Sequence, residues 1–243
     1  MRLFGRSRRT KDTTVRCSAI VPAAGSSSRM AGIDKMFAEL DGVPILGRTL
    51  AALERCDSID EIVVATREDL IPRVKSLCKE LKLKKVTQIV AGGDTRLRSV
   101  MNGISAAAET AEIIAVHDGA RPFVTPEIVN STVEAARKYH AAAPGVKVKD
   151  TVKLVKGGRV RGTPDRETLF AIQTPQVFDA DLLKGALQNA LNQGLAITDD
   201  CMAVEAIGAE IRITEGSYRN IKITTPEDMY LGAAIIKMSK DEI

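Results

Sequence analysis

Short apolar runs alternate with helical segments through residue 139, and this alternation limits the fold more than any other feature of the chain. The apolar runs have the length of buried strands, and the segments between them repeat their apolar side chains with the period of a helix. Strands that alternate with helices are joined in parallel by right-handed crossovers, so the sequence predicts an α/β domain with a doubly wound, mostly parallel sheet. The predicted strands are residues 19–21, 61–65, 86–90 and 112–116, and the predicted helices are residues 44–55, 70–81, 96–110 and 126–139.

The loop after the first strand, PAAGSSSRMAGIDK at residues 22–35, is the first candidate site, because ligands of such sheets bind beyond the carboxyl ends of the strands. Its small residues let backbone N–H groups approach phosphate oxygens. Arg29 and Lys35 can stabilise charge that develops during phosphoryl or nucleotidyl transfer. The alternative is a surface turn with two solvated cations. The loop matches neither the Walker pattern nor the dinucleotide glycine pattern, which disfavours both of those functions.

The loop after the third strand, residues 91–99, contains two adjacent glycines followed by hydroxyl and carboxylate side chains. Gly93 allows close backbone approach, and Asp94 and Ser99 can hydrogen-bond a base or a ribose. The alternative is a helix N-terminus at which Asp94 or Thr95 is the N-cap. The two interpretations are compatible with each other.

The loop after the fourth strand places His117, Asp118 and Arg121 in succession. An acid at the end of a buried parallel strand suits a metal–phosphate complex or substrate hydroxyls, and Arg121 can bind a phosphate through two hydrogen bonds. The alternative is a salt bridge between Asp118 and Arg121 within a turn. For His117 we expect a packed, hydrogen-bonded histidine, not a catalyst.

Composition and charge exclude several classes of function. With 243 residues, the chain fits one sizeable domain or two small ones, and no apolar run is long enough to span a membrane. Residues 1–16 carry a net charge of +5, so the remaining chain carries −1 of the total of +4 and shows no nucleic-acid-like excess. We expect these residues to be a basic, disordered leader, without a secretory signal. The four cysteines contain no C-x-x-C pair and there are only two histidines, which disfavours a Cys/His metal site and suits reduced thiols in the cytoplasm.

Residues 147–173 interrupt the alternation of strands and helices. Residues 151–155 and 159–161 alternate polar and apolar side chains around Lys156-Gly157-Gly158, which predicts a tight hairpin. A hairpin without a covering helix needs a partner surface. We therefore predict a dimerisation arm, with a flap folded on its own domain as the alternative.

The C-terminal part contains one further candidate residue. Residues 181–192 and 199–206 predict helices, and residues 210–214 predict a strand. Ile221 and Ile223 alternate with Lys222, which predicts that Lys222 points to the opposite face. Thr225 and Pro226 then predict the start of a final helix, ending at about residue 238. An exposed lysine without a role is the alternative for Lys222.

Five motifs occur together in one order and spacing, and in this respect the chain resembles the 2-C-methyl-D-erythritol 4-phosphate cytidylyltransferase family over roughly residues 17–238. The motifs are Pro22-Ala23-Ala24-Gly25-x-x-x-Arg29-Met30 with Lys35, Gly93-Asp94-x-Arg96-x-x-Ser99, His117-Asp118-x-Ala120-Arg121-Pro122, Thr174-Pro175-Gln176 and Ile221-Lys222-Ile223-Thr224-x-Pro226-Glu227-Asp228. The chain departs from the family pattern in its serine triplet, where the family has a glycine-rich loop, and in Asp34, where a proline is common.

The resemblance implies a Rossmann-like nucleotidyltransferase fold over residues 17–243, with residues 147–173 as the arm of a homodimer. It also implies transfer of a cytidylyl group from CTP to methylerythritol phosphate with Mg²⁺, in non-mevalonate isoprenoid precursor synthesis. The implied catalytic residues are Arg29, Lys35, Arg166 and Lys222. The implied nucleotide-binding residues are Ala23, Ala24, Gly25, Gly93, Asp94, Ser99 and Gly119. The implied substrate-binding residues are Asp118, Arg121, Thr151, Arg166, Thr174 and Lys222, and we expect Thr151, Arg166 and Thr174 to reach the site from the other subunit. Mg²⁺ is expected mainly on the CTP phosphates, with Asp118 as the candidate protein ligand.

Three other functions are compatible with parts of the pattern. A ribitol 5-phosphate cytidylyltransferase keeps the CTP loops and changes the sugar pocket. A glycosyltransferase that binds nucleotide sugars needs a D-x-D metal motif after a strand, and the three loops described above contain none. A non-catalytic nucleotide-binding module does not need Arg29, Lys35 and Lys222 together, so the presence of all three argues against this function.

Overall fold

A mostly parallel sheet forms the centre of the computed structural model, which describes residues 16–25 and 35–241. The strands lie in the order β10-β7-β11-β6-β1-β4-β5, with β12 paired to β7. Strands β6, β1, β4 and β5 are parallel, and β11 runs antiparallel to both β6 and β7. The sequence-based prediction of a doubly wound sheet is therefore confirmed. The bounds are β1 Cys17–Pro22, β4 Glu61–Thr66, β5 Val86–Ala91, β6 Ile113–Val116, β7 Ala141–Lys147, β10 Phe170–Ile172, β11 Gln176–Asp179 and β12 Arg212–Glu215.

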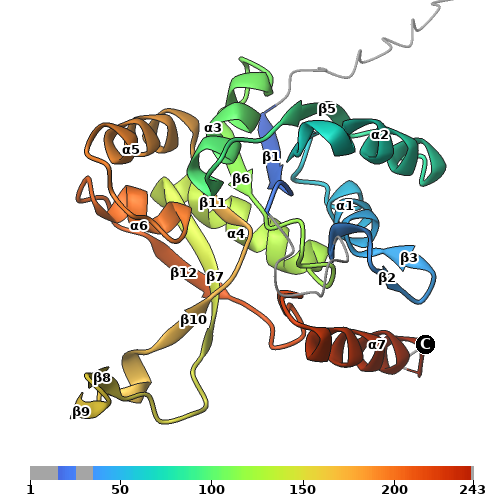
Figure 1. The fold of residues 1–243 in the computed structure, drawn as a ribbon. Helices are drawn as coiled ribbons and strands as arrows, with labels where there is room; N and C mark the ends of the chain where they lie inside the picture. Colours follow the sequence, from blue (N-terminus) through green and yellow to red (C-terminus); the bar gives the residue numbers. More distant parts are fainter. Residues whose placement is uncertain (1–15, 26–34, 242–243) are drawn as a thin grey trace, which may run out of the picture.

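Helices cover both faces of this sheet (Figure 1). Alternation along β1 explains the two layers, because Ala19 and Val21 face one buried cluster and Ile20 faces the other. The first cluster includes side chains of α1, α2 and α4, and the second includes side chains of α3, α5 and α6. Helix α7 packs separately, on a small cluster that contains Leu40, Ile45 and Ile223. The bounds are α1 Ile45–Glu54, α2 Ile71–Glu80, α3 Arg96–Ala106, α4 Pro126–Tyr139, α5 Ala180–Asn192, α6 Asp200–Glu205 and α7 Pro226–Asp241.

Several element boundaries differ from the sequence-based predictions. Helix α3 ends at Ala106, four residues before the predicted end, and β12 covers residues 212–215 instead of 210–214. Residues 221–223 form no strand, although Ile223 is fully buried and Lys222 is exposed, as the alternation predicts. The strand β7 was not predicted, because its sequence AAAPGVK contains residues that are depleted in strands.

The predicted hairpin is confirmed within the arm. Strands β8 (Leu154–Lys156) and β9 (Arg159–Gly162) pair antiparallel, and Gly157 and Gly158 have φ angles of +58° and +71°. These angles suit the two-residue turns that join antiparallel strands. The arm leaves the body where β7 pairs with β10, and Figure 1 shows β8 and β9 at its far end. Leu154, Val155 and Val160 are more than half exposed there.

Two further findings concern membranes and thiols. Among the described helices, none has the length and apolar character needed to cross a membrane.

Cys17, Cys56, Cys78 and Cys201 are all free and buried. Their burial matches the expectation of reduced cysteines that pack as small hydrophobic residues.

Candidate active site

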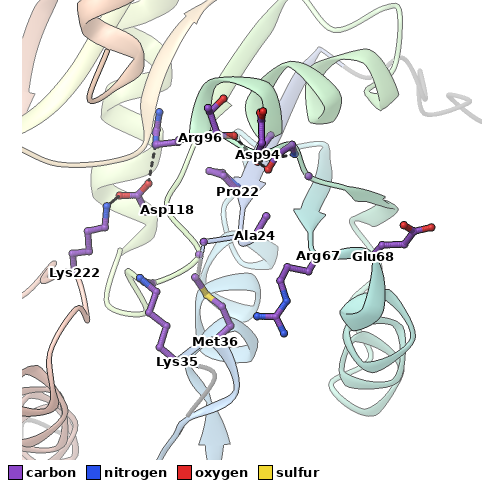
Figure 2. A pocket seen from close by; sticks show the side chains of 17 residues that line it. Pro22, Ala24, Lys35, Met36, Arg67, Glu68, Asp94, Arg96, Asp118 and Lys222 are labelled. Atoms are coloured by element: carbon purple, nitrogen blue, oxygen red, sulfur yellow. Dashed lines mark hydrogen bonds and ion pairs between the residues drawn. The ribbon is translucent and has the colours of Figure 1, made fainter. Parts of the chain in front are cut away.

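A pocket of about 600 Å³ lies beyond the carboxyl ends of β1, β5 and β6 (Figure 2). This is the position at which doubly wound sheets bind ligands. Among its described lining residues, four are basic and three are acidic, and together they come from all three predicted loops, from the segment after β4 and from the segment before α7. The predicted site residues that line it are Ala24, Gly25, Lys35, Gly93, Asp94, Ser99, Asp118, Gly119 and Lys222.

Asp118 is the centre of the charge cluster on one side of the pocket. Its Oδ2 atom lies 2.8 Å from Lys222 Nζ, and its Oδ1 atom lies 3.5 Å from Arg96 Nε. Figure 2 shows both contacts, with the Lys35 side chain extending toward the same side of the pocket. Burial alone would raise the pKa of Asp118, but Lys222 and Arg96 hold that pKa well below its usual value. The carboxylate therefore stays ionised and is fixed between two cations.

Arg121 connects Asp118 to the segment that contains Lys222. Its Nη1 group donates a hydrogen bond of 2.7 Å to the carbonyl oxygen of Asn220, and its Nε atom lies 3.8 Å from Asp118 Oδ2. The guanidinium is mostly buried and does not line the described pocket. The structure therefore shows the salt bridge within the turn that was the alternative, and the expected phosphate contact of Arg121 stays a prediction.

His117 and Thr174 form a buried support under Asp118. The Thr174 hydroxyl accepts a hydrogen bond of 3.1 Å from the Asp118 backbone N–H and lies 3.1 Å from His117 Nδ1. Burial lowers the pKa of His117 to about 4, so the ring is neutral at pH 7. The expectation of a packed histidine is confirmed. Thr174 is 4% exposed and lies outside the arm, so in this chain it supports Asp118, and its expected contact with the other subunit's site stays a prediction.

The loop before α3 is held together by its own hydroxyl groups. Ser99 Oγ accepts a hydrogen bond of 3.0 Å from the Gly93 N–H and lies 2.9 Å from the Thr95 carbonyl oxygen. Thr95, and not Asp94, is the N-cap, because its hydroxyl accepts from Arg98 N–H at 3.2 Å. Asp94 lines the pocket and pairs with Arg98 Nε at 3.3 Å. Ser99 therefore shapes the loop, and both interpretations of this segment hold in part.

Small residues bring the loops into contact with each other. A Cβ atom on Gly92 would lie 2.6 Å from the Ala24 Cβ, and one on Gly119 would lie 3.3 Å from the Ala23 Cβ. Ala23 itself is buried and donates its N–H to the Ala65 carbonyl oxygen at 2.7 Å, so it packs under the pocket and does not line it. The predicted residue Arg29 and the serine triplet lie outside the described residues.

The predicted residues of the arm are not at this chain's own pocket. Thr151 and Arg166 are exposed, and Arg166 Nη1 donates to the Lys149 carbonyl oxygen at 3.3 Å. Neither residue lines the described pocket, and Figure 1 shows β8 and β9 at the far end of the arm, away from the body of the domain. Their expected role in the site of another copy of the chain stays a prediction.

Sequence reasoning missed Arg96 as a partner of Asp118. Arg96 belongs to one of the five motifs but received no role, although it lines the pocket and contacts both Asp118 and Asp200. Arg67 and Glu68 also line the pocket and carry no motif signal. The chain contains one D-x-D sequence, at residues 179–181, where Asp179 caps α5 by accepting from two backbone N–H groups. It is therefore a helix cap outside the described pocket.

No cluster of three or more metal-binding side chains occurs among the described residues. The carboxylates of the pocket are Asp118, which already contacts two cations, and the more exposed Glu68 and Asp94. A donor set of this kind suits a Mg²⁺ ion that is held mainly by ligand phosphates, because Mg²⁺ is often bound by one or two carboxylates plus substrate phosphates.

Comparisons with known proteins agree with the geometry. Residues 17–238 match the family model of 2-C-methyl-D-erythritol 4-phosphate cytidylyltransferase. The enzymes of that name from Halalkalibacterium halodurans and Geobacter metallireducens are 44% and 45% identical to this chain, and the matches cover 90% of this chain and 96% and 97% of theirs. The solved 4-diphosphocytidyl-2C-methyl-D-erythritol synthase of Anaerococcus prevotii superposes with a TM-score of 0.82 at 32% identity, covering 92% of this chain and 97% of its own. The cytidylyltransferase structure from Thermus thermophilus gives a TM-score of 0.75 at 33% identity, with coverages of 91% and 99%. This chain belongs to the 2-C-methyl-D-erythritol 4-phosphate cytidylyltransferase family.

Proposed function

We propose that this chain transfers the cytidylyl group of CTP to 2-C-methyl-D-erythritol 4-phosphate, giving 4-diphosphocytidyl-2-C-methyl-D-erythritol and pyrophosphate. This is the cytidylyl transfer step of non-mevalonate isoprenoid precursor synthesis. The observation that carries the proposal is the pocket at the carboxyl edge of the sheet, which Lys35, Arg96 and Lys222 line and in which Arg96 and Lys222 hold one ionised carboxylate, Asp118.

The attacking group is an oxygen of the substrate phosphate. A phosphomonoester with a second pKa of about 6 is mostly dianionic at pH 7, so no protein base has to remove a proton. The oxygen forms a bond to the α-phosphorus of CTP, the bond between this phosphorus and the α–β bridging oxygen breaks, and pyrophosphate leaves with that electron pair. His117 has no part in this step, because it is fully buried and neutral.

Charge neutralisation and positioning therefore supply the catalysis, because two anions must approach each other. Because Lys35 lines the pocket, we assign it to the charge at the α-phosphate, and the contact of Lys222 with Asp118 at the edge of the pocket supports its assignment to the sugar phosphate. Arg29 is also proposed to stabilise charge at the α-phosphate, from its motif alone. The backbone around Ala24, Gly25 and Gly93 is proposed to surround the cytidine.

Mg²⁺ is proposed as the cofactor, on the donor set described above. When bound, it would neutralise phosphate charge and so reduce the repulsion between the reactants. Asp118 is the protein group placed to share in its binding. Because the Asp118 carboxylate is ionised and held by Lys222 and Arg96, it needs no deprotonation before it binds a cation.

A homodimer with a shared site is proposed from the arm. Its exposed apolar strands need a partner surface, and its candidate residues Thr151 and Arg166 lie away from this chain's own pocket. The four free, buried thiols suit a reducing compartment, so we place the enzyme in the cytoplasm.

A substrate panel tests this function. The purified protein is mixed with each of CTP, UTP, ATP and GTP and with methylerythritol phosphate or ribitol 5-phosphate, and pyrophosphate release is measured. We expect release with CTP and methylerythritol phosphate, and at least about 100-fold less with ribitol 5-phosphate, because a polar pocket rejects a substrate that leaves its groups unpaired. Equal or greater release with ribitol 5-phosphate would overturn the proposed acceptor.

A further inference from the structure

We propose that Asp200, at the start of α6, is a positioning residue that fixes the guanidinium of Arg96 in the nucleotide pocket. The proposal rests on the proposed cytidylyl transfer, because it assigns a role within the same site. Asp200 itself does not line the pocket. It acts through Arg96, which does.

The contact between the two side chains is short and buried. Arg96 Nη2 donates a hydrogen bond to Asp200 Oδ2 at 2.7 Å, and the Asp200 side chain is 0% exposed. Arg96 comes from the first turn of α3, and Asp200 comes from the first turn of α6, a helix far away in the sequence. The contact therefore joins two separate elements at the wall of the pocket.

Asp200 is in turn held by the sheet. The backbone N–H groups of Asp200 and Cys201 donate to Gln176 Oε1 at 2.9 and 3.0 Å. Gln176 belongs to β11, which pairs with β6, the strand that ends next to Asp118. The same glutamine donates its amide group to Asp199 Oδ2 at 2.7 Å. The carboxylate of Asp200 thus has a fixed position relative to the strand that supplies Asp118.

Two acids compete for Arg96, and the distances show which of them holds it more closely. Asp200 is at 2.7 Å from Nη2, whereas Asp118 is at 3.5 Å from Nε. Asp118 has its shorter contact with Lys222, at 2.8 Å. Basic and acidic side chains therefore alternate in a row, from Lys222 through Asp118 and Arg96 to Asp200. Burial raises the pKa of Asp200, and the Arg96 guanidinium opposes that rise and favours the ionised carboxylate. When Lys222 turns to a substrate phosphate, Arg96 remains beside Asp118 only because Asp200 fixes it.

The test is a double-mutant cycle with Asp200→Asn and Arg96→Gln. Asp200→Asn keeps the shape of the side chain and removes the charge that orients Arg96. We expect kcat/KM to fall by about 10- to 100-fold, since a small misplacement of a catalytic group can cost 10²-fold. Arg96→Gln should lower kcat/KM as well. In the double variant the Asp200 change should add less than about threefold, because a residue that acts only through Arg96 has nothing left to position.

If Asp200 had only a structural role, the double-mutant cycle would give a different change in kcat/KM. A loss of packing would lower kcat/KM by the same factor in both backgrounds, and that outcome overturns the proposal, as does full activity of Asp200→Asn. Glu205→Gln is the matched control, because it removes one negative charge from the exposed face of the same helix. It should leave kcat/KM unchanged.

A measurement without catalysis separates this inference from the proposed function and uses no Asp200 variant. In ¹⁵N-labelled protein, the Nη–H signals of Arg96, which include the donor to Asp200, are assigned by their absence from Arg96→Lys and compared with those of Arg98, whose side chain is 53% exposed. We expect slow solvent exchange for Arg96 and fast exchange for Arg98. Equal exchange would overturn the anchoring of Arg96, whereas absent pyrophosphate release with slow exchange would overturn only the reaction.

Discussion

Lys222 Nζ lies 2.8 Å from Asp118 Oδ2, so the segment before α7 is joined to the end of β6 by an ion pair at the edge of the pocket. The lysine side chain is 40% exposed, whereas the aspartate side chain is 12% exposed. One partner is therefore free to turn toward a ligand, and the other is held in the protein. This asymmetry is what a cation that recruits a phosphate requires, since it must exchange one anion for another.

Replacement of Lys222 by methionine tests this exchange. The substitution keeps most of the apolar stem and removes the charge, so we expect kcat/KM for methylerythritol phosphate to fall by about 10²- to 10³-fold, as for the loss of one transition-state donor. KM for CTP should change little, because the loops that surround the nucleotide stay intact. Steady-state kinetics with each substrate varied in turn measure both effects. Lys184→Met is the control, because Lys184 is half exposed and pairs only with the exposed Asp181 at 3.7 Å. A Lys222→Met enzyme with normal kcat/KM would remove Lys222 from the site.

A mixing experiment tests whether the arm completes the site of a second copy. Lys35→Ala damages the body of the site, and Arg166→Ala damages the arm, so each variant alone should lose about 10²- to 10³-fold in turnover. In a mixed dimer, one site receives both intact residues and the other receives neither. An equimolar mixture should therefore regain about a quarter of the unaltered activity once its subunits have exchanged at random. Absence of recovery, with exchange verified by differently tagged subunits, would contradict the shared site.

His117 makes stability depend on pH in a defined window. Because burial lowers the folded-state pKa to about 4, the unfolded chain binds a proton below pH 6.5 that the folded chain rejects. Stability from this group is complete above pH 6.5 and is lost as the pH falls toward 4, by about 2 kcal/mol between pH 7 and pH 5. Urea unfolding at both values measures the loss. His117→Asn should reduce that difference, and His140→Asn, at an exposed position, should not.

The central strands and the arm could be predicted because their signals are local. Residues 62–65 and 113–116 are continuous apolar runs, and the two glycines of the hairpin indicate a turn within a few residues. Strand β7 gives no such signal, because its alanines, Pro144 and Gly145 have low strand preference. Its small residues are needed by its neighbours: a Cβ on Gly145 would lie 3.3 Å from side-chain atoms of Ile172 and Ile213. Tertiary packing, and not local preference, makes this segment a strand.

In the candidate site, too, features with local sequence signals could be predicted, and contacts made by tertiary packing could not. The loops of the site could be located, because topology places the carboxyl ends of the parallel strands β1, β4, β5 and β6 at one edge of the sheet. The partners of individual side chains could not be predicted, since Arg96 meets Asp200 only after β11 and α6 have packed against α3. Thr174 belongs to a motif, and in this chain its hydroxyl accepts a hydrogen bond from the Asp118 backbone under the site, which the motif did not indicate. A motif marks a position that matters without saying whether it contacts the ligand or supports the residue that does.

Two glycines in helices test the packing around the site, because we expect alanine at these two positions to have opposite effects on the free energy of unfolding. In α3, a Cβ on Gly103 would lie 2.5 Å from Ile20 Cγ2, and Ile20 is fully buried in β1. In α5, a Cβ on Gly185 meets nothing within 4 Å. Alanine in place of glycine stabilises a helix interior by about 1 kcal/mol, so Gly185→Ala should raise the free energy of unfolding by about that amount. Gly103→Ala gains the same helix preference but must displace a buried side chain at a cost of about 1–3 kcal/mol, so the net change should be zero to about 2 kcal/mol of destabilisation. Urea titrations of the two variants beside the unaltered protein give both values. If Gly103→Ala were as stabilising as Gly185→Ala, the close approach of α3 to β1 would be contradicted, and with it the position from which Arg96 enters the pocket.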